Sequence, residues 1–327
     1  MKKVFILGGT GFLGYYTSHE LLARGYKVAE ISLPPTPADN LFPAEVESHL
    51  GDLQTYTDEQ ILQLLDGVYA FIYAAGADER VCPEAPATTF FYQANVIPTQ
   101  RIARLARQAG VKKFVLFNSY FSHFAEQWTD LHLNKEQAYP RTRLLQEEVA
   151  MFEGGKDMDV MSLRLPYIFG VMPGRTPLWT MFTEQVRGKD TVYVPQGGTA
   201  MVTARQVAEA AVGAIELGQH EGRYAICDTN MKYLDFYQYM VEALGQTETT
   251  KLIPAPIEAF KPAFAEHDEH ARQAGKEHGI HLAVTADIQG RDAYLDPNDT
   301  MPILKINKDD VIASIKETLQ VCVNAKL

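Results

Sequence analysis

A tyrosine and an arginine spaced by one helical turn are the residues best suited to proton chemistry in this chain. Tyr139 and Arg143 lie four residues apart in a segment whose early Pro140 is typical of a first helical turn, so both side chains fall on one face. A phenol with an ordinary pKa of about 10 exchanges protons poorly near neutrality, whereas a guanidinium beside it favours the phenolate. Ser119 follows a buried strand expected at residues 111–117, where its hydroxyl could hydrogen-bond the reacting oxygen. Together these residues predict a site that exchanges a proton with a substrate oxygen.

The N-terminal residues have the pattern of a dinucleotide-binding unit. An apolar run at residues 4–7 predicts a buried parallel strand, and Gly8, Gly11 and Gly14 follow it at a spacing of three. Apolar residues at helical spacing continue over 18–23. In such a unit the glycines allow a tight turn, close approach of backbone to phosphate, and packing of helix on strand. We therefore expect a pyrophosphate at the helix N-terminus.

The end of the second strand, expected at residues 27–33, bears on the choice of cofactor. Dinucleotide folds usually place an acid here to hold the adenosine ribose, whereas this chain has Ser32, with Glu30 on the same strand face. No lysine or arginine follows until Arg80, so a local partner for a 2′-phosphate is also missing. The expected cofactor is NAD or NADP, with NAD favoured.

Strands and helices then alternate as in a parallel α/β sheet. The expected strands are at residues 49–53, 68–75 and 111–117, and the expected helices are at 58–65 and 91–109. Small residues at 74–76 would allow a flat cofactor ring to approach the backbone, although tight packing explains them equally well. The predicted fold is α/β, a Rossmann-type doubly wound parallel sheet with a smaller C-terminal α/β substrate domain.

Several motifs in a characteristic order carry a family resemblance. The chain resembles the extended short-chain dehydrogenase/reductase superfamily, in its NAD-dependent epimerase/dehydratase-like branch, through about residue 215. The motifs are Gly8-Gly9-Thr10-Gly11-Phe12-Leu13-Gly14, Gly51-Asp52-Leu53, Ala74-Ala75-Gly76, Asn95-Val96 before Thr99, Gly110-Val111-Lys112-Lys113-Phe114-Val115, and Arg164-Leu165-Pro166-Tyr167-Ile168-Phe169-Gly170.

The resemblance implies roles for individual residues. It implies that Ser119 and Tyr139 belong to a Ser–Tyr–Lys catalytic set, with Arg143 at the lysine position. It implies that Asp52 touches adenine and that Pro166 and Ile168 border the nicotinamide. The full expected cofactor-binding set is Gly8, Thr10, Gly11, Phe12, Leu13, Gly14, Ser32, Asp52, Leu53, Ala74, Ala75, Gly76, Asn95, Pro166 and Ile168.

The sequence departs from this family pattern at three places. Arg143 keeps the charge of the lysine, but a planar guanidinium is not equivalent to a point donor. Ser32 stands where an acid is expected. Tyr120 and Phe121 replace the Asp-Glu pair that family dehydratases usually carry after the serine, which disfavours a dehydratase.

We expect a dinucleotide-binding domain at residues 1–170, to which 190–228 return, and a smaller substrate domain at 171–189 and 229–327. Arg175 and Trp179 lie in a loop that could meet a substrate, although a structural role is favoured. Histidines between 267 and 281 have spacings compatible with metal binding, but their polar surroundings favour a solvated helix, and no metal site is predicted.

Charge and cysteine content limit the partners. The chain has 327 residues and a formal net charge of −11, which disfavours nucleic acid and anionic membranes as partners. No apolar stretch is long enough for a membrane helix. Three widely spaced cysteines, Cys82, Cys227 and Cys322, are typical of a reducing compartment, so a cytoplasmic location is expected, with a small-molecule substrate and a homodimer possible.

The sequence therefore predicts an NAD(P)-dependent oxidoreductase or epimerase acting on a hydroxyl or carbonyl group, with a nucleotide sugar as one candidate substrate. One alternative is a non-catalytic NAD(P)-binding regulator or sensor, suggested by Arg143. Another keeps the fold but places catalysis on other groups, such as Asp78, Glu79, His123 or His132.

Overall fold

A seven-stranded parallel sheet forms the larger part of the computed structural model, which describes residues 1–325. The strand order is β10-β6-β5-β4-β1-β2-β3, and every neighbouring pair is parallel. The strands are β1 (Lys3–Leu7), β2 (Lys27–Ser32), β3 (Glu47–Leu50), β4 (Val68–Tyr73), β5 (Lys113–Ser119), β6 (Asp159–Leu165) and β10 (Gly222–Ala225). This confirms the predicted α/β class and parallel sheet.

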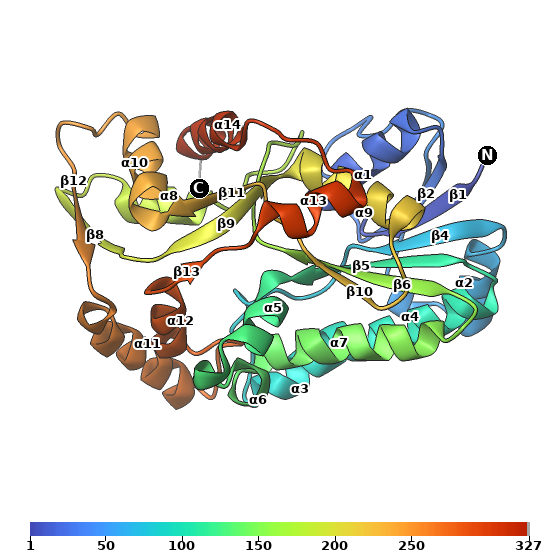
Figure 1. Ribbon diagram of the computed structural model, residues 1–327, viewed down its shortest axis with the longest axis horizontal. Helices are drawn as coiled ribbons and strands as arrows, with labels where there is room; N and C mark the ends of the chain where they lie inside the picture. Colours follow the sequence, from blue (N-terminus) through green and yellow to red (C-terminus); the bar gives the residue numbers. More distant parts are fainter. Residues whose placement is uncertain (326–327) are drawn as a thin grey trace.

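Helices cover both faces of this sheet because its strands are apolar on both sides. Within β1, Val4 and Ile6 pack into one core and Phe5 into the other, as the alternation of a strand requires. Figure 1 shows helices on both the upper and the lower side of the sheet. The upper pair is α1 (Phe12–Ala23) and α9 (Ala204–Leu217), and below lie α2 (Asp58–Leu64), α4 (Ile97–Gln108) and α7 (Ala138–Gly154).

The strand order reverses between β1 and β4. The chain runs outward from β1 through β2 to β3, then returns to place β4 on the other side of β1. At such a switch point the loops after the two strands diverge and leave a crevice beyond their carboxyl ends. Here that crevice is bordered by the glycine turn after β1 and by Ala74–Gly76 after β4.

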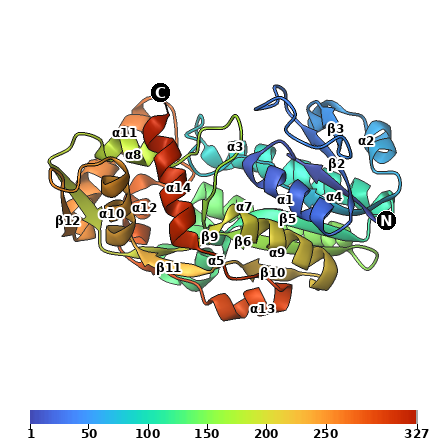
Figure 2. The ribbon, with the colours of Figure 1, turned by 90° about the horizontal axis from the view of Figure 1, so that it is seen from above.

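A smaller part lies at the opposite end of the molecule from β2 and β3 (Figure 2). A four-stranded sheet centres on β9 (Gly198–Thr203), which pairs with β7 (Tyr167–Phe169), β11 (Thr229–Lys232) and β13 (Asp292–Ala293), and β8 (Thr191–Pro195) pairs with β12 (Lys251–Ala255). Thus β8 and β9 lie in the small sheets, whereas α9 and β10 return to the large sheet. The proposed domain boundaries stay a prediction.

The remaining helices complete both parts. They are α3 (Ala87–Phe91), α5 (Tyr120–Gln127), α6 (Leu133–Glu136), α8 (Thr180–Val186), α10 (Tyr233–Ala243), α11 (Lys261–Gln273), α12 (Leu282–Gln289), α13 (Met301–Leu304) and α14 (Val311–Asn324). The last helix begins after Asp310, which caps it by accepting a 2.9 Å hydrogen bond from the Ala313 amide. Among residues 1–325, no helix has the length and apolar character to span a membrane.

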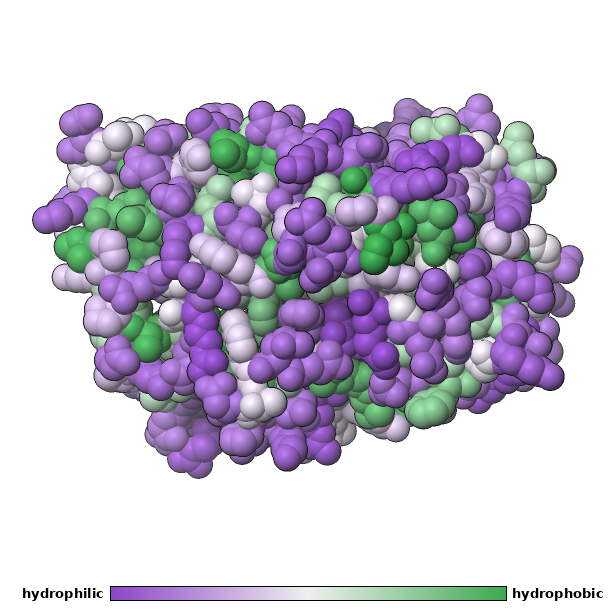
Figure 3. Space-filling model, viewed as in Figure 1, coloured by the Kyte–Doolittle hydropathy of each residue, from purple (hydrophilic) through white to green (hydrophobic). Residues whose placement is uncertain are grey.

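Polar residues dominate the face shown in Figure 3, where apolar residues form separate small groups. Of the histidines considered as metal ligands, His267 and His270 lie on α11, and His278 and His281 follow it. His278 contacts Asp268 at 2.9 Å, and His281 contacts Glu277 at 3.3 Å. The expectation of one solvated helix therefore holds for the first pair only.

Candidate functional site

The glycine turn after β1 is shaped by two very close backbone contacts. Gly8 has φ +91°, and a Cβ there would lie 2.6 Å from the carbonyl oxygen of Ala74. A Cβ on Gly14 would lie 2.2 Å from the Gly8 carbonyl oxygen. Only glycine satisfies both positions, so the turn can bring the N-terminus of α1 close to the β1–β4 crevice. The first amides of α1 then remain available to an anion.

A cavity of about 540 Å³ opens beside this turn, at the end where the sequence predicts the adenosine. Eight of the expected cofactor-binding residues line it: Gly8, Thr10, Gly11, Ser32, Asp52, Leu53, Ala75 and Gly76. The Asp52 carboxylate also accepts a 2.9 Å hydrogen bond from the Gln54 amide, which holds the short turn that follows.

A buried acid lies behind Ser32 at the end of this cavity where the ribose is expected. Ser32 donates a 2.6 Å hydrogen bond to Glu30 and accepts one of 2.9 Å from the Thr10 amide. Ser48 also hydrogen-bonds Glu30, which is fully buried, and burial raises the pKa of that carboxyl. The serine therefore joins the glycine turn to a buried carboxyl group, an arrangement that the spacing of Glu30 and Ser32 alone did not indicate.

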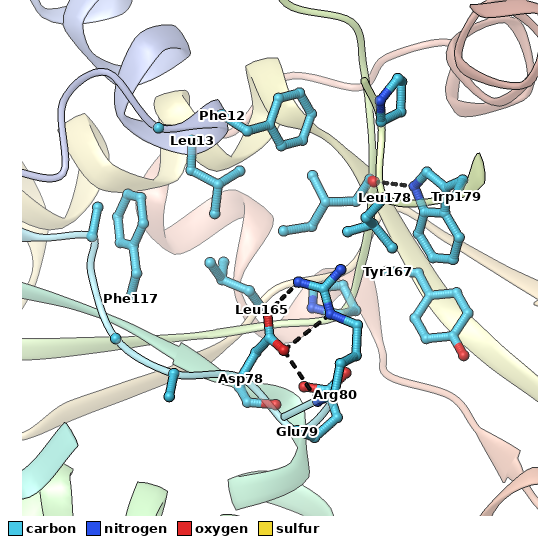
Figure 4. Close-up of a pocket in the computed structure, with 18 of the residues that line it drawn as sticks. Phe12, Leu13, Asp78, Glu79, Arg80, Phe117, Leu165, Tyr167, Leu178 and Trp179 are labelled. Atoms are coloured by element: carbon cyan, nitrogen blue, oxygen red, sulfur yellow. Dashed lines mark hydrogen bonds and ion pairs between the residues drawn. The ribbon is translucent and has the colours of Figure 1, made fainter. Parts of the chain in front are cut away.

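A second cavity, of about 700 Å³, shares Gly11, Ala75, Gly76, Ala77 and Arg175 with the first. Figure 4 shows Phe12, Leu13 and Phe117 on one side of it and Leu178, Trp179 and Tyr167 on another. The predicted residues that line it are Gly11, Phe12, Leu13, Ala74, Ala75, Gly76, Ser119, Tyr139, Arg143, Pro166 and Ile168. The expected proton-exchange and nicotinamide residues are thus brought to one cavity.

Tyr139 and Ser119 form the polar centre of this cavity wall. Tyr139 lies on the first turn of α7 and is 3% exposed, and Ser119 ends β5. Both side chains line the same cavity, where the Ser119 hydroxyl accepts a 3.2 Å hydrogen bond from the Phe121 amide. The rings of Phe91 and Phe121 meet the Tyr139 ring edge-on, with centroids 5.5 and 6.2 Å away. These aromatic contacts hold the phenol ring in place without engaging its oxygen.

Arg143 lies one turn further along α7, with its guanidinium carbon 5.7 Å from the centre of the Tyr139 ring. Its Nη1 donates a 2.5 Å hydrogen bond to Gln146, and its Nη2 donates one of 2.8 Å to the Phe117 carbonyl oxygen. Gln146 in turn donates to the Thr99 hydroxyl at 2.7 Å. The Nε of Arg143 is buried and, within residues 1–325, has no hydrogen-bond partner. The Nε–H of a firmly held guanidinium therefore has no partner among the described residues and is left for a ligand.

The electrostatics of Tyr139 differ from the sequence-based expectation. Burial raises its pKa to about 12, although the Arg143 charge and the nearby Ser119 hydroxyl both act to lower it. The guanidinium thus works in the expected direction, but the loss of solvation has the larger effect. In the free protein at neutral pH the phenol is protonated and is a proton donor.

Two predicted cofactor-binding residues line neither cavity. Gly14 packs beneath the turn, and Asn95 is fully buried, with its side chain accepting from the Ala77 amide at 2.8 Å and donating to the Ala77 carbonyl at 2.9 Å. Both residues therefore hold the backbone behind the cavity wall in place and do not line the cavity themselves. His123 and His132, considered as alternative catalytic groups, also lie outside the linings of both cavities.

The larger cavity contains groups to which the sequence analysis gave little weight. Asp78, Glu79 and Arg80 follow β4 and line the cavity, as do Tyr120 and Phe121 at the start of α5. Arg175 and Trp179, for which a structural role was favoured, line it as well. Their position in the chain could have indicated them, because each follows the carboxyl end of a parallel strand or lies in the loop after β7.

The chain is similar in sequence to sterol-processing enzymes, by the names that these relatives carry. The chain is 27% identical over 212 residues to human sterol-4-alpha-carboxylate 3-dehydrogenase, decarboxylating; the match covers 62% of this chain and 53% of that protein. It is 25% identical over 263 residues to sterol demethylase protein B of Methylococcus capsulatus, covering 76% of each. The chain thus spans about half the length of the human relative.

Solved structures share the fold. A nucleoside-diphosphate-sugar epimerase from Pseudomonas aeruginosa has a TM-score of 0.71 at 18% identity, covering 99% of this chain and 96% of that one. The Bordetella bronchiseptica enzyme WbmH in complex with NAD+ has a TM-score of 0.68 at 18% identity, covering 99% and 97%. A model of the NAD dependent epimerase/dehydratase family matches residues 4–227. The chain belongs to this family of NAD-dependent oxidoreductases and epimerases, within the extended short-chain dehydrogenase/reductase superfamily.

Proposed function

We propose that this protein is an NAD-dependent oxidoreductase that interconverts a secondary alcohol and a ketone, with Tyr139 as the proton-exchanging residue. The observation that carries the proposal is the meeting of the Ser119 hydroxyl, the Tyr139 phenol and the Arg143 guanidinium at one cavity that opens onto the glycine turn. The names of the relatives support this proposal. They include a sterol-4-alpha-carboxylate 3-dehydrogenase among the sequence relatives and a nucleoside-diphosphate-sugar epimerase among the structural neighbours.

The residues present fit a dinucleotide. The glycine turn offers free helix amides to a pyrophosphate, and the unpaired, buried Nε of Arg143 offers a donor to a ribose hydroxyl. NAD bound there would supply or accept the hydride. Arg143 would hold the ribose with the nitrogen that its protein contacts leave free.

The protein's own part in the reaction is proton transfer and orientation. Tyr139 donates its proton to the carbonyl oxygen in the reductive direction and removes the hydroxyl proton in the oxidative direction. Ser119 donates a hydrogen bond to the same oxygen and orients it. Arg143 stabilises the phenolate that Tyr139 becomes after donating its proton, because its charge lies close to the ring.

Transfer of deuterium from NADH labelled at C4 tests this function. Incubation with a panel of uncharged ketones and keto sugars is expected to place deuterium on the carbinol carbon of at least one product, as read by mass spectrometry. The control is the Tyr139→Phe variant, which should transfer far less label. Binding of NADH with no label transfer to any ketone would contradict the proposal.

A non-catalytic regulator is the second candidate, and one observation favours it. Two of the three nitrogens of Arg143 are already occupied by Gln146 and the Phe117 carbonyl, so its guanidinium has a structural role that a catalytic lysine would not need. NAD binding that changes thermal stability, together with failure of label transfer, would support this candidate instead.

The pH dependence should differ between the two reaction directions. Because the pKa of Tyr139 is raised to about 12, the phenol is protonated throughout the neutral range and the phenolate is rare. The kcat/KM for ketone reduction should therefore stay flat from about pH 6 to 9, whereas that for alcohol oxidation should rise about tenfold per pH unit. A plateau in oxidation at neutral pH would contradict this, and initial rates over that range provide the measurement.

NAD should bind more tightly than NADP. A 2′-phosphate would enter a cavity whose ribose end is backed by buried Glu30 and Ser32. Of the two arginines that line this cavity, Arg101 is paired with Asp58, and exposed Arg175 is the nearest alternative partner. We expect at least about tenfold weaker binding of NADP by calorimetry, equivalent to about 1.4 kcal/mol. Equal affinities would contradict this, and the Arg175→Ala variant would then show whether Arg175 holds the phosphate.

A homodimer is a further part of the proposal. The outer face of α7 exposes Leu145 and Phe152, the latter 79% exposed, which supports burial against a second copy. Light scattering of the purified protein measures this directly.

A further inference from the structure

The loop after β4 brings an acidic side chain without a cationic partner to the larger cavity. Arg80 donates a 3.0 Å hydrogen bond from Nε to Asp78 and forms a second contact with the same carboxylate. Glu79 lies between these two residues in sequence, and no ion pair of Glu79 is found within residues 1–325. Figure 4 shows Glu79 beside the Asp78–Arg80 pair at the cavity. The arginine of this loop is therefore used by Asp78, and Glu79 is left to face the cavity.

Three tyrosines line the same cavity as Glu79. For Tyr120, Tyr139 and Tyr167, burial is the main cause of a raised pKa, and the charge of Glu79 adds to it. The carboxyl thus lies within electrostatic reach of the proton-exchanging tyrosine and of two others in the same cavity. Burial likewise raises the pKa of Glu79, with Asp78 adding to the effect and Arg80 and Arg143 opposing it.

The other walls of the cavity are mostly apolar and offer little to a charged substrate. Leu165, Leu178, Trp179, Met181 and Phe182 line it. Of the arginines that line it, Arg80 is paired and Arg143 is bound to the protein, so exposed Arg175 is the one left at the mouth. Two phosphates of a nucleoside diphosphate would need more positive charge than this, and Glu79 would oppose them.

We propose that Glu79 is a substrate-binding residue that hydrogen-bonds a second oxygen of an uncharged, largely apolar alcohol or ketone and selects against nucleoside diphosphate sugars. The inference deepens the proposed function and rests on it, since it assigns the substrate class of the same cavity. Tyr139 and Ser119 meet the reacting oxygen, and Glu79 meets another oxygen elsewhere on the same ring system. A carboxyl group that lines the cavity can do this as a donor to a carbonyl or as an acceptor from a hydroxyl.

Binding of ketones to the complex with oxidised NAD tests the inference without turnover, because neither a ketone nor the oxidised cofactor can donate a hydride. The probes are 2-decalone and decalin diketones with the second oxygen at each ring position, and UDP-glucose is the nucleoside diphosphate sugar with which they are compared. Calorimetry is expected to show at least one two-oxygen decalin binding about three- to tenfold more tightly than 2-decalone, as one hydrogen bond allows. UDP-glucose should bind more weakly than that decalin.

The variant series separates Glu79 from its neighbours. Glu79→Ala should abolish the preference for the second oxygen, and Glu79→Gln, which keeps size and hydrogen bonding, should retain part of it. Glu84→Gln, an exposed residue of the same loop, is the matched control and should change nothing.

Three results would overturn the inference: no two-oxygen decalin is preferred, Glu79→Ala keeps the preference, or UDP-glucose binds more tightly than every decalin. A Glu79 effect on ketone binding combined with failure of deuterium transfer would instead remove the proposed function and leave Glu79 as a ligand contact.

Discussion

Replacing Arg143 by methionine is expected to lower kcat/KM by about a hundredfold or more and to weaken NAD binding. The substitution removes the charge that stabilises the Tyr139 phenolate and the Nε donor proposed for the ribose. It also leaves the Gln146 side-chain oxygen and the Phe117 carbonyl oxygen without their buried donor. Each orphaned group costs about 1–3 kcal/mol, so thermal unfolding should begin at a clearly lower temperature.

Two further variants separate charge from shape at this position. Arg143→Lys restores a cation but not the planar fork, so we expect it to recover most of the rate while remaining less stable than the wild type. Arg141→Met, on the exposed side of the same helix, is the matched control and should leave rate and stability unchanged. Wild-type turnover by Arg143→Met would show that the guanidinium is structural only and has no part in catalysis.

The large sheet could be predicted from the sequence because its signals are local. The apolar run of β1, the glycine spacing after it and the small residues after β4 each act through the backbone over a few residues, and all were found where expected. Motif order then identified the family, which the family model confirms. The cavities followed from the topology, since parallel strands bring their carboxyl ends to one edge.

Properties that depend on solvation or on distant contacts could not be predicted this way. The spacing of Tyr139 and Arg143 indicated the sign of their interaction, but not that burial would outweigh it and raise the phenol pKa. The sequence likewise gave no sign that Asn95 would hold Ala77 from behind the cavity. The pairing of β8 and β9 in small sheets also depends on strands far along the chain, such as β12 and β11.

The Asp78–Glu79–Arg80 segment illustrates a different limit. Three adjacent charged residues in a loop are usually solvated, and the sequence does not show that Asp78 and Arg80 pair while Glu79 faces an aromatic cavity. This pairing decides how much charge the cavity presents to a substrate. The pairing can be recognised only in the folded structure, where the loop after β4 lies near α5 and α7.

Tyr139→Phe should produce the largest loss of activity of any single-atom change in this protein. The variant lacks only the phenol oxygen, and its ring can still pack against Phe91 and Phe121, so folding and NAD binding should be retained. Losing the proton donor typically lowers the rate about 10²–10⁴-fold. Ser119→Ala should have a smaller effect, because it removes an orienting hydrogen bond and not the proton itself.

The most direct measurement is therefore kcat of Tyr139→Phe, with the ketone that the wild type reduces fastest and with NAD affinity measured in parallel. We predict that kcat of this variant falls by about a hundredfold or more, whereas its dissociation constant for NAD is unchanged. Wild-type turnover by a folded, NAD-binding Tyr139→Phe enzyme would contradict it.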